Sequence, residues 1–223
     1  MMEFADKFTA VSQRITDFLA QHQTEPATRL TGAFSLFPGR SEWDLYGAID
    51  AVYVLYTMGQ LTVVTDQESR QQWSARILAC QDETGWFTRR NLRGHSKEHA
   101  TAYAIGALSL LSQNADEAYV SQIRPIQALH PLLTDAHYFQ RWIRHLQFRY
   151  TPQDVLHKNV GWHHIWRGSH IGGGVAATIA MTRHLLPQWW PGQVDVDHWF
   201  NQYFNWLDQH ANPQTFLCQR AFW

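Results

Sequence analysis

Cysteine is scarce in this chain: it occurs twice, as Cys80 and Cys218. The two residues form no CxxC pair, which excludes a zinc ribbon and a CxxC redox motif. The N-terminal residues MMEFADKF contain no basic segment followed by an apolar run, so no secretory signal is visible. We therefore expect a cytoplasmic protein with reduced thiols.

Long apolar runs and an excess of one charge are also missing. No stretch approaches the ~18 consecutive apolar residues that a membrane-spanning helix needs. The 18 basic residues nearly balance the 19 acidic ones, so the net charge is −1. No basic stripe indicates nucleic-acid binding, and no acidic tail indicates disorder. We expect a soluble chain that binds neither a membrane nor nucleic acid.

Tryptophan and histidine, in contrast, are abundant, with 11 and 13 copies in 223 residues. Tryptophan is seldom fully buried, because its indole N–H needs a hydrogen-bond partner. So many indoles favour a cleft with aromatic walls. The alternative is that these aromatic residues only pack helices together.

Apolar residues recur at helical spacing, and no convincing run of strands is visible. The chain is long enough for a substantial core, so we predict a single all-α domain over residues 1–223, built of helical hairpins. The predicted N-caps are Ser41, Thr65, Ser96 and Thr134. The predicted helices are residues 3–21, 41–58, 65–80, 96–112, 134–146, 172–186 and 195–210.

The stretch 80–111 concentrates polar groups around one loop. A helix ends there at a turn, an aromatic pair follows, and a basic loop leads to a new helix near Ser96. Glu98 and His99 lie in the first turn of that helix, where we place general acid–base chemistry. Alternatively, they belong to a satisfied polar pair between helices. The candidate substrate-binding residues of this stretch are Trp86, as a sugar platform, Arg90 and His95.

His95 and His99 lie four positions apart, and two histidines at that spacing on one helix can share a metal ion. Ser96 is the predicted cap, however, which leaves His95 outside the helix and spoils that geometry. We expect no metal site and no cofactor.

A second polar cluster precedes three consecutive glycines, Gly172 to Gly174. We predict a loop over residues 150–170 and a helix that begins at the glycines, whose backbone amides would attract an anion. His170 is the candidate catalytic residue here, because imidazole exchanges protons near pH 7. Alternatively, the glycines only let the helix pack tightly. The candidate substrate-binding residues are Trp162, His163, His164, Trp166 and Arg167.

Ordinary glycoside hydrolysis needs two carboxyl groups, one as acid and one as base or nucleophile. Asp44 and Asp50 stand out on a mostly apolar predicted helix, but their spacing of six residues separates them around it. We therefore pair Asp44 with Glu98 as candidate catalytic carboxylates. Asp44 could equally cap its own helix, because it lies in the first predicted turn.

Residues 81–86, Gln-Asp-Glu-Thr-Gly-Trp, resemble the Q-x-x-x-G-x-W turn of terpenoid cyclase and prenyltransferase-type α/α toroids. They also resemble the D-x-x-T-G-x-W turn of six-hairpin glycosidases. The segment 204–218 repeats the pattern imperfectly: an aromatic residue precedes a Thr by eleven positions in both copies, Thr84 and Thr215. The resemblance implies that Gln81 or Asp82 caps backbone at a hairpin end and that the Trp packs against it.

The resemblance implies an α/α toroid whose loops converge on one face. The chain has fewer predicted helices than a complete toroid, so it would be one part of a longer protein or a partial toroid that a second copy closes.

By this resemblance we expect a carbohydrate-acting enzyme, a glycoside hydrolase or lyase, with a glycan or small-molecule substrate. The alternatives are a non-catalytic binding scaffold and a terpenoid-cyclase-like enzyme, although the DxDD and DDxxD motifs are absent. The enzyme requires that the loop after Cys80 and the loop before Gly172 open at one mouth, which would bring His99 near His170.

Overall fold

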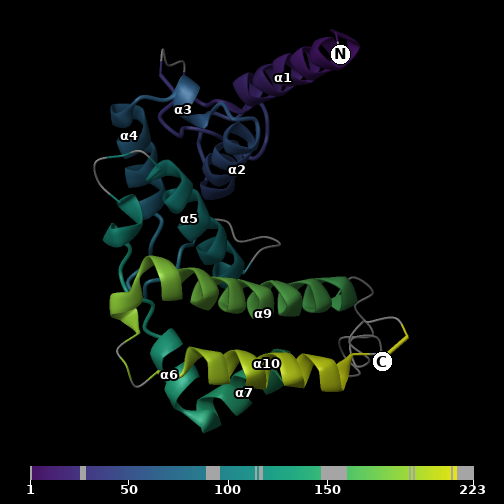
Figure 1. Ribbon diagram of the computed structural model, residues 1–223, viewed down its shortest axis with the longest axis vertical. Helices are drawn as coiled ribbons and strands as arrows, with labels where there is room; N and C mark the ends of the chain where they lie inside the picture. Colours follow the sequence, from purple (N-terminus) through teal and green to yellow (C-terminus); the bar gives the residue numbers. More distant parts are fainter. Residues whose placement is uncertain are drawn as a thin grey trace. The chain divides into compact units, whose positions relative to one another are not determined.

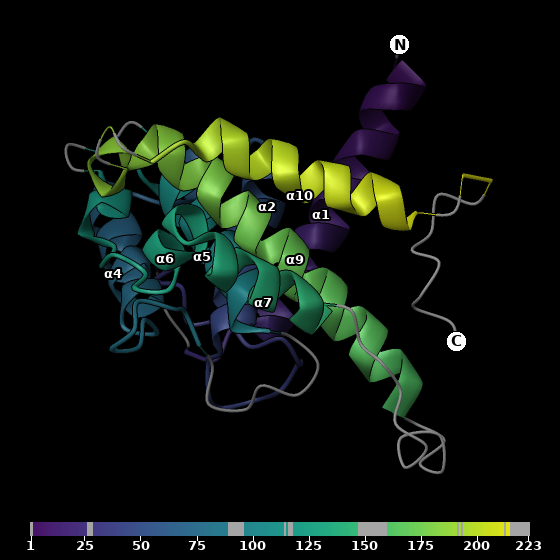
Figure 2. The same ribbon diagram turned by 90° about the horizontal axis from the view of Figure 1, so that it is seen from below.

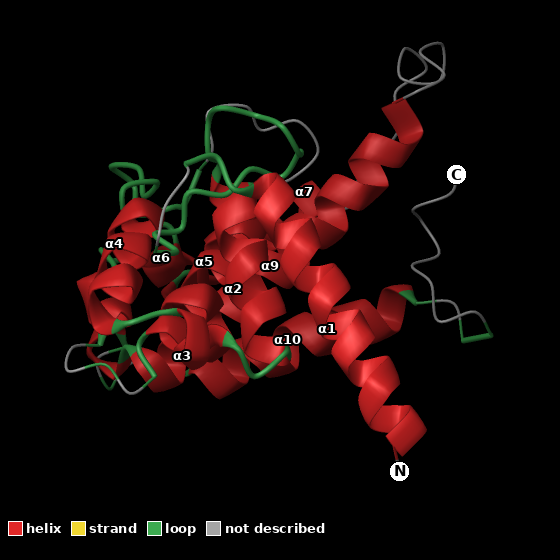
Figure 3. Cartoon of the chain, turned by 90° about the horizontal axis from the view of Figure 1, so that it is seen from above, coloured by secondary structure: helices red, strands yellow, loops and turns green. Residues whose placement is uncertain are grey.

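The computed structural model contains helices and no β-strand over the residues that it describes (Figure 3). The prediction of an all-α chain is confirmed for these residues. Within them, no helix is both long enough and apolar enough to cross a membrane. Side chains are described at all of these positions except 2–8 and 160–167. The described residues are 2–25, 29–88, 96–113, 115, 118–146, 160–190, 192, 194–211 and 213–214.

The chain divides into two compact units. Unit 1 comprises residues 1–81 and 103–123, and unit 2 comprises residues 82–102 and 124–223. The boundary falls inside helix α5 (Lys97–Leu111). The single domain over residues 1–223 stays a prediction.

Unit 1 is built around α2, which packs against α3 and α4, while α4 also packs against η1. Helix α1 extends away from the rest of this unit at its N-terminal end (Figure 1). Besides the end of α5, the elements of unit 1 are α1 (Met2–His22), α2 (Leu45–Thr57), α3 (Leu61–Val64), α4 (Gln67–Leu78) and η1 (Tyr119–Gln122).

The side chain of Trp73 is the centre of the unit 1 core and is fully buried. Its ring stacks on Phe34 with a centroid distance of 5.3 Å, and its indole N–H donates to the carbonyl of Ala48 at 3.1 Å. Gly32 has a positive φ of 82°, and a Cβ there would lie 2.3 Å from Trp73 Cδ1. Only glycine therefore suits this position, both for its backbone angle and for its contact with the indole.

Helices α2 and α4 begin later than the sequence predicts. Asp44, not Ser41, caps α2: its carboxylate accepts hydrogen bonds from the first amides of the helix. Asp66, not Thr65, caps α4 by accepting from Ser69 N at 2.8 Å. The Thr65 hydroxyl instead donates to the carbonyl of Leu61.

Unit 2 is an array of packed helices in which α7 contacts α6 and α9, and α9 contacts α10 and η2. Helices α9 and α10 run antiparallel side by side, as Figures 1 and 2 show, and so form a helical hairpin. Besides the start of α5, the elements are α6 (Leu129–Thr134), α7 (Ala136–Leu146), α9 (Val160–Leu185), η2 (Pro187–Trp189) and α10 (Val196–His210).

Aromatic side chains make up much of the unit 2 core. Trp199 on α10 is 2 % exposed and stacks on Tyr203 with a centroid distance of 5.2 Å. The rings of Phe139 and Trp142 on α7 pack against the same indole, with centroid distances of 6.0 and 5.9 Å. The alternative interpretation of the many aromatic residues, that they pack helices together, is confirmed for these four.

Of the four helix starts predicted in unit 2, those at Ser96 and Asp195 are confirmed, and those at Thr134 and Gly172 are wrong. Ser96 caps α5, and Asp195 caps α10 by accepting from His198 N at 2.8 Å. Thr134 does not cap α7. Asp135 does, because its carboxylate accepts from His137 N and Tyr138 N at 2.8 and 3.1 Å.

Candidate functional site

The imidazole rings of His99 and His170 stack on each other. Their centroids lie 4.3 Å apart and their planes differ by 12°. Both side chains are half-buried. Ser96 Oγ accepts a hydrogen bond from His99 N at 3.2 Å, which fixes His99 in the first turn of α5. The two segments that the sequence expects to meet therefore do meet at these rings.

Glycine lets α9 cross α5 closely enough for this contact. A Cβ on Gly174 would lie 2.4 Å from the carbonyl carbon of Glu98 and 2.5 Å from His99 N. A Cβ on Gly172 would lie 2.7 Å from Tyr203 Oη. Glycine within a helix costs about 1 kcal/mol relative to alanine. That cost is offset here by packing that no larger residue would permit.

The glycines lie in the middle of α9, because this helix begins at Val160 rather than at Gly172. The predicted loop over residues 150–170 is therefore wrong for residues 160–170, which are helical. Amides in a helix interior bond to the preceding turn and cannot bind an anion. The anion site predicted at these glycines is wrong, and the tight-packing interpretation is confirmed for Gly172 and Gly174.

A stacked imidazole pair can act as both proton donor and proton acceptor. Each neutral imidazole has one donor and one acceptor nitrogen, and protonation makes both nitrogens donors. A pair with one proton presents one acid and one base together. Glu98, half-buried next to His99, is the carboxylate nearest in sequence.

Both carboxylate oxygens of Asp44 already accept hydrogen bonds within the protein, so neither is available for catalysis. Its Oδ1 accepts from Tyr46 N and Gly47 N at 3.0 and 3.1 Å. Its Oδ2 accepts from Leu36 N at 2.8 Å and from the Ser35 hydroxyl at 3.5 Å. These bonds join the start of α2 to the segment before it. The capping interpretation of Asp44 is confirmed.

Trp86 is a core residue rather than a sugar platform. Its side chain is 4 % exposed and belongs to the buried apolar cluster of unit 2. Asp82 Oδ1 closes the turn before it by accepting from Thr84 N at 2.9 Å and from Trp86 N at 3.1 Å. Gly85 has φ of 90°, and a Cβ there would lie 2.4 Å from the carbonyl of Pro125. A ring so enclosed has no face left to stack on a ligand.

Several predicted site residues lie outside the described part of the chain. Arg90 and His95 are two of them; Thr215 and Cys218, which belong to the second copy of the turn rather than to the predicted site, also lie outside it. On α9 the backbone is described, but the side chains are not, for Trp162, His163, His164, Trp166 and Arg167.

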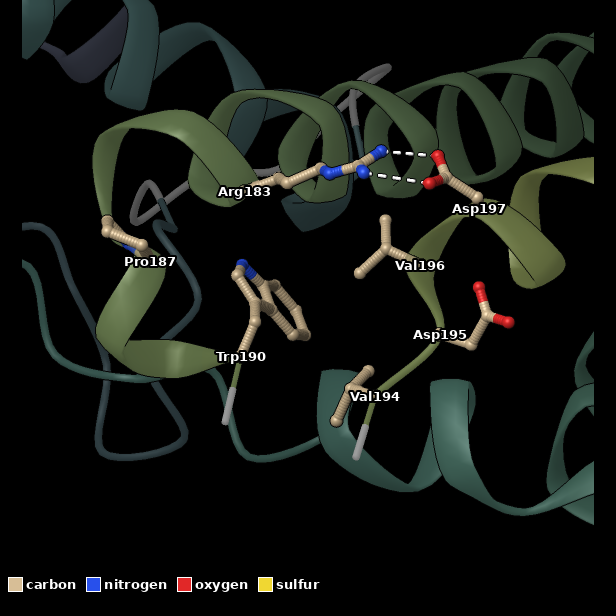
Figure 4. A pocket seen from close by; sticks show the side chains of 7 residues that line it. All are labelled: Arg183, Pro187, Trp190, Val194, Asp195, Val196 and Asp197. Atoms are coloured by element: carbon tan, nitrogen blue, oxygen red, sulfur yellow. Dashed lines mark hydrogen bonds and ion pairs between the residues drawn. The ribbon is translucent and has the colours of Figure 1, made fainter. Parts of the chain in front are cut away.

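A cavity of about 230 Å³ lies in unit 2 where α9, η2 and α10 come together (Figure 4). Neither His99 nor His170 lines it. None of the residues that line it was predicted as a site residue from the sequence. The signal that could have found it is a Trp pair followed by Pro-Gly and then by Asp-Val-Asp, over residues 189–197. The lining residues are Arg183, Pro187, Trp190, Val194, Asp195, Val196 and Asp197.

A smaller cavity of about 80 Å³ lies in unit 1, between α1, α2 and the segment 34–36. Asp50 lines it among mostly apolar groups, and burial, with a smaller contribution from the charge of Asp44, raises the pKa of Asp50 to about 6. Its volume suffices for a few water molecules at roughly 30 Å³ each. An apolar chamber for a terpenoid chain needs far more room.

Metal binding and similarity to known proteins were the remaining sources of information on the site. Over the described residues, no three His, Cys, Asp or Glu side chains are grouped so as to hold a metal ion. The Cys80 thiol donates a hydrogen bond to the carbonyl of Arg76 at 3.7 Å. No protein family, curated protein or solved structure matches the chain.

Proposed function

We propose that this chain is a carbohydrate-acting enzyme in which His99 and His170 transfer protons. The observation that carries the proposal is the stacked, half-buried imidazole pair, brought together from α5 and α9. The substrate class comes from the resemblance of residues 81–86 to the turns of α/α-toroid glycosidases. In this proposal the helical hairpins form a partial toroid, completed by a second copy or by further polypeptide.

The residues favour a lyase over a hydrolase. Hydrolysis ordinarily uses two carboxyl groups, and Asp44 is committed to its helix cap. In an elimination, a neutral imidazole removes the proton from the carbon beside a sugar carboxyl group. The electron pair forms a C=C bond, the glycosidic C–O bond breaks, and an imidazolium protonates the leaving oxygen. A histidine pair with one proton supplies both groups.

The proposal is tested by incubating the full chain with a panel of polysaccharides, including uronic-acid polymers. Both new reducing ends and the absorbance of unsaturated products are followed. A lyase yields both signals, and a hydrolase yields reducing ends alone. Variants His99→Ala and His170→Ala should lose the activity. His130→Ala, which removes an exposed imidazole from the same unit, should retain it. Absence of turnover on every polymer would defeat the proposal.

A second candidate, a non-catalytic scaffold, is favoured by the burial of Trp86 and by the volumes of the cavities. The larger described cavity has about 230 Å³, below the ~300–1,000 Å³ of typical small-molecule pockets. The histidine pair would then be an interhelical polar contact. A scaffold predicts no turnover for the wild type and a lower unfolding free energy for the histidine variants.

A further inference from the structure

The cavity between α9, η2 and α10 is lined by both an indole ring and an ion pair (Figure 4). Trp190 packs against the apolar core of unit 2 and also lines the cavity. Its Nε1 atom is buried and has no hydrogen-bond partner in the described part of the chain. A buried donor without an acceptor is costly, but this atom is closed to solvent, so the indole ring rather than its N–H group is what Trp190 offers to a ligand in the cavity.

Arg183 and Asp197 form a two-pronged ion pair at the cavity, in which Nη2 donates to Oδ2 at 2.8 Å and Nη1 donates to Oδ1. Both side chains are substantially exposed, at 41 % and 69 %. An exposed pair of this kind adds little stability. A guanidinium has five N–H donors and a carboxylate about four acceptor positions, so both groups can bind further partners.

Asp195 adds a second carboxylate. Its Oδ1 accepts a hydrogen bond from His198 N at 2.8 Å, and its Oδ2 takes no part in that helix cap. The charges of Arg183, Asp195 and Asp197 sum to −1. The pairing with Arg183 lowers the pKa of Asp197, so that this carboxylate stays ionised. An anionic ligand is therefore disfavoured, whereas a neutral one with several hydroxyls finds both donors and acceptors.

We propose that this cavity binds a single neutral sugar ring, with the apolar face of the ring on the Trp190 indole. The hydroxyls bond to the outer edges of Arg183 and Asp197 and to Asp195. A volume of about 230 Å³ limits the ligand to one ring. The ligand class rests on the proposed carbohydrate function, but the cavity is separate from the histidine pair.

The test is titration of the full chain, labelled with ¹⁵N at its indole groups, with methyl glycosides of glucose, galactose and mannose. Sodium glucuronate serves as the anionic probe. The Trp190 cross-peak is identified by its absence from Trp190→Phe. At least one neutral glycoside should shift it saturably, and glucuronate should bind at least tenfold more weakly. Arg183→Gln and Asp197→Asn should weaken binding about tenfold or more.

Asp195→Asn keeps a good N-cap and removes a charge, so it tests the site even where the other variants disturb the fold. This variant should also bind the neutral glycoside more weakly than the wild type does. Trp189→Phe and Arg29→Gln, a neighbouring indole and an exposed arginine of unit 1, should leave binding unchanged. Two results would overturn the inference. One is the absence of a saturable shift with any glycoside. The other is wild-type affinity in all three variants, Arg183→Gln, Asp197→Asn and Asp195→Asn.

The two proposals fail separately. His170→Ala should bind the glycoside as the wild type does, while losing turnover. Turnover without a shift at Trp190 rejects the sugar cavity alone. A shift without turnover of any polymer rejects the enzyme and leaves a sugar-binding protein.

Discussion

His99 and His170 lie 71 positions apart in the sequence (170 − 99), yet their rings stack with centroids 4.3 Å apart. The contact depends on two local features: the Ser96 cap, which fixes the start of α5, and Gly174, which lets α9 pass against it. Both features can be tested apart from any activity.

Replacing Gly174 with alanine should destabilise the protein by about 1–3 kcal/mol. The new methyl group would meet backbone atoms of Glu98 and His99 at 2.4–2.5 Å, and backbone cannot rotate out of the way. Gly173→Ala is the matched control, because no atom lies within 4 Å of its added Cβ. It should stabilise by about 0.5–1 kcal/mol through helix propensity. Urea unfolding measures both, and equal effects would contradict the described crossing.

The stacked pair should show energetic coupling in a double-mutant cycle. Residues in direct contact interact by about 0.5–3 kcal/mol, so His99→Ala and His170→Ala together should cost less than the sum of the single changes. His99→Ala combined with His130→Ala is the control pair and should be additive. Additivity of His99→Ala and His170→Ala in urea unfolding would mean that the rings do not interact in solution.

Asp50 should make the protein less stable as pH rises from about 4 to above 6. Burial raises its folded-state pKa to about 6 from an ordinary 3.8, so its stabilising protonated form is fully present below pH 4 and lost through pH 6. Asp50→Asn should therefore match the wild type near pH 4. Near pH 7 it should be more stable by about 1 kcal/mol, a value reduced for the partial exposure of the side chain.

Unfolding free energies of wild type and Asp50→Asn, measured across this pH range, test the point. Asp17→Asn, on the exposed surface of α1, serves as the control and should show no such divergence. A constant difference between wild type and Asp50→Asn at all pH values would contradict the buried carboxyl group.

Asp44 should behave as a structural residue. Asp44→Ala removes the cap of α2 and the acceptor for Leu36 N, and should cost about 2 kcal/mol or more, with Asp44→Asn costing less. Ser41→Ala, at the position that the sequence predicted as the cap, should change the unfolding free energy by less than about 0.5 kcal/mol. A larger loss in Ser41→Ala than in Asp44→Ala would reverse this assignment.

Helix spacing predicted the all-α class, but the predicted starts failed where two capping residues compete. At Ser41 and Thr65 an aspartate follows, Asp44 or Asp66, and the aspartate caps the helix. A carboxylate accepts two amides and adds a favourable charge at the positive end of the helix. Ser96, which no aspartate follows before the helix, was predicted correctly.

The site was predicted in part. Local sequence singled out His99 and His170, whose rings do meet, and the glycines that lie within α9. The acid–base role of the two histidines stays a prediction. Local sequence could not show that Gly174 serves a contact with α5, because that contact joins residues distant in the chain. Trp86 was misassigned for the same reason: its exposure depends on packing against α6, α7, α9 and α10, which no local pattern reveals.

The most direct measurement is the ratio of kcat/KM between His170→Ala and His130→Ala on the polymer that the wild type turns over best. General acid–base catalysis contributes roughly 10²–10⁴-fold, so the ratio should fall to about 10⁻² or lower when both variants are assayed under conditions in which urea unfolding shows each to be fully folded. A ratio near 1 would show that the histidine pair holds helices together and moves no proton in catalysis.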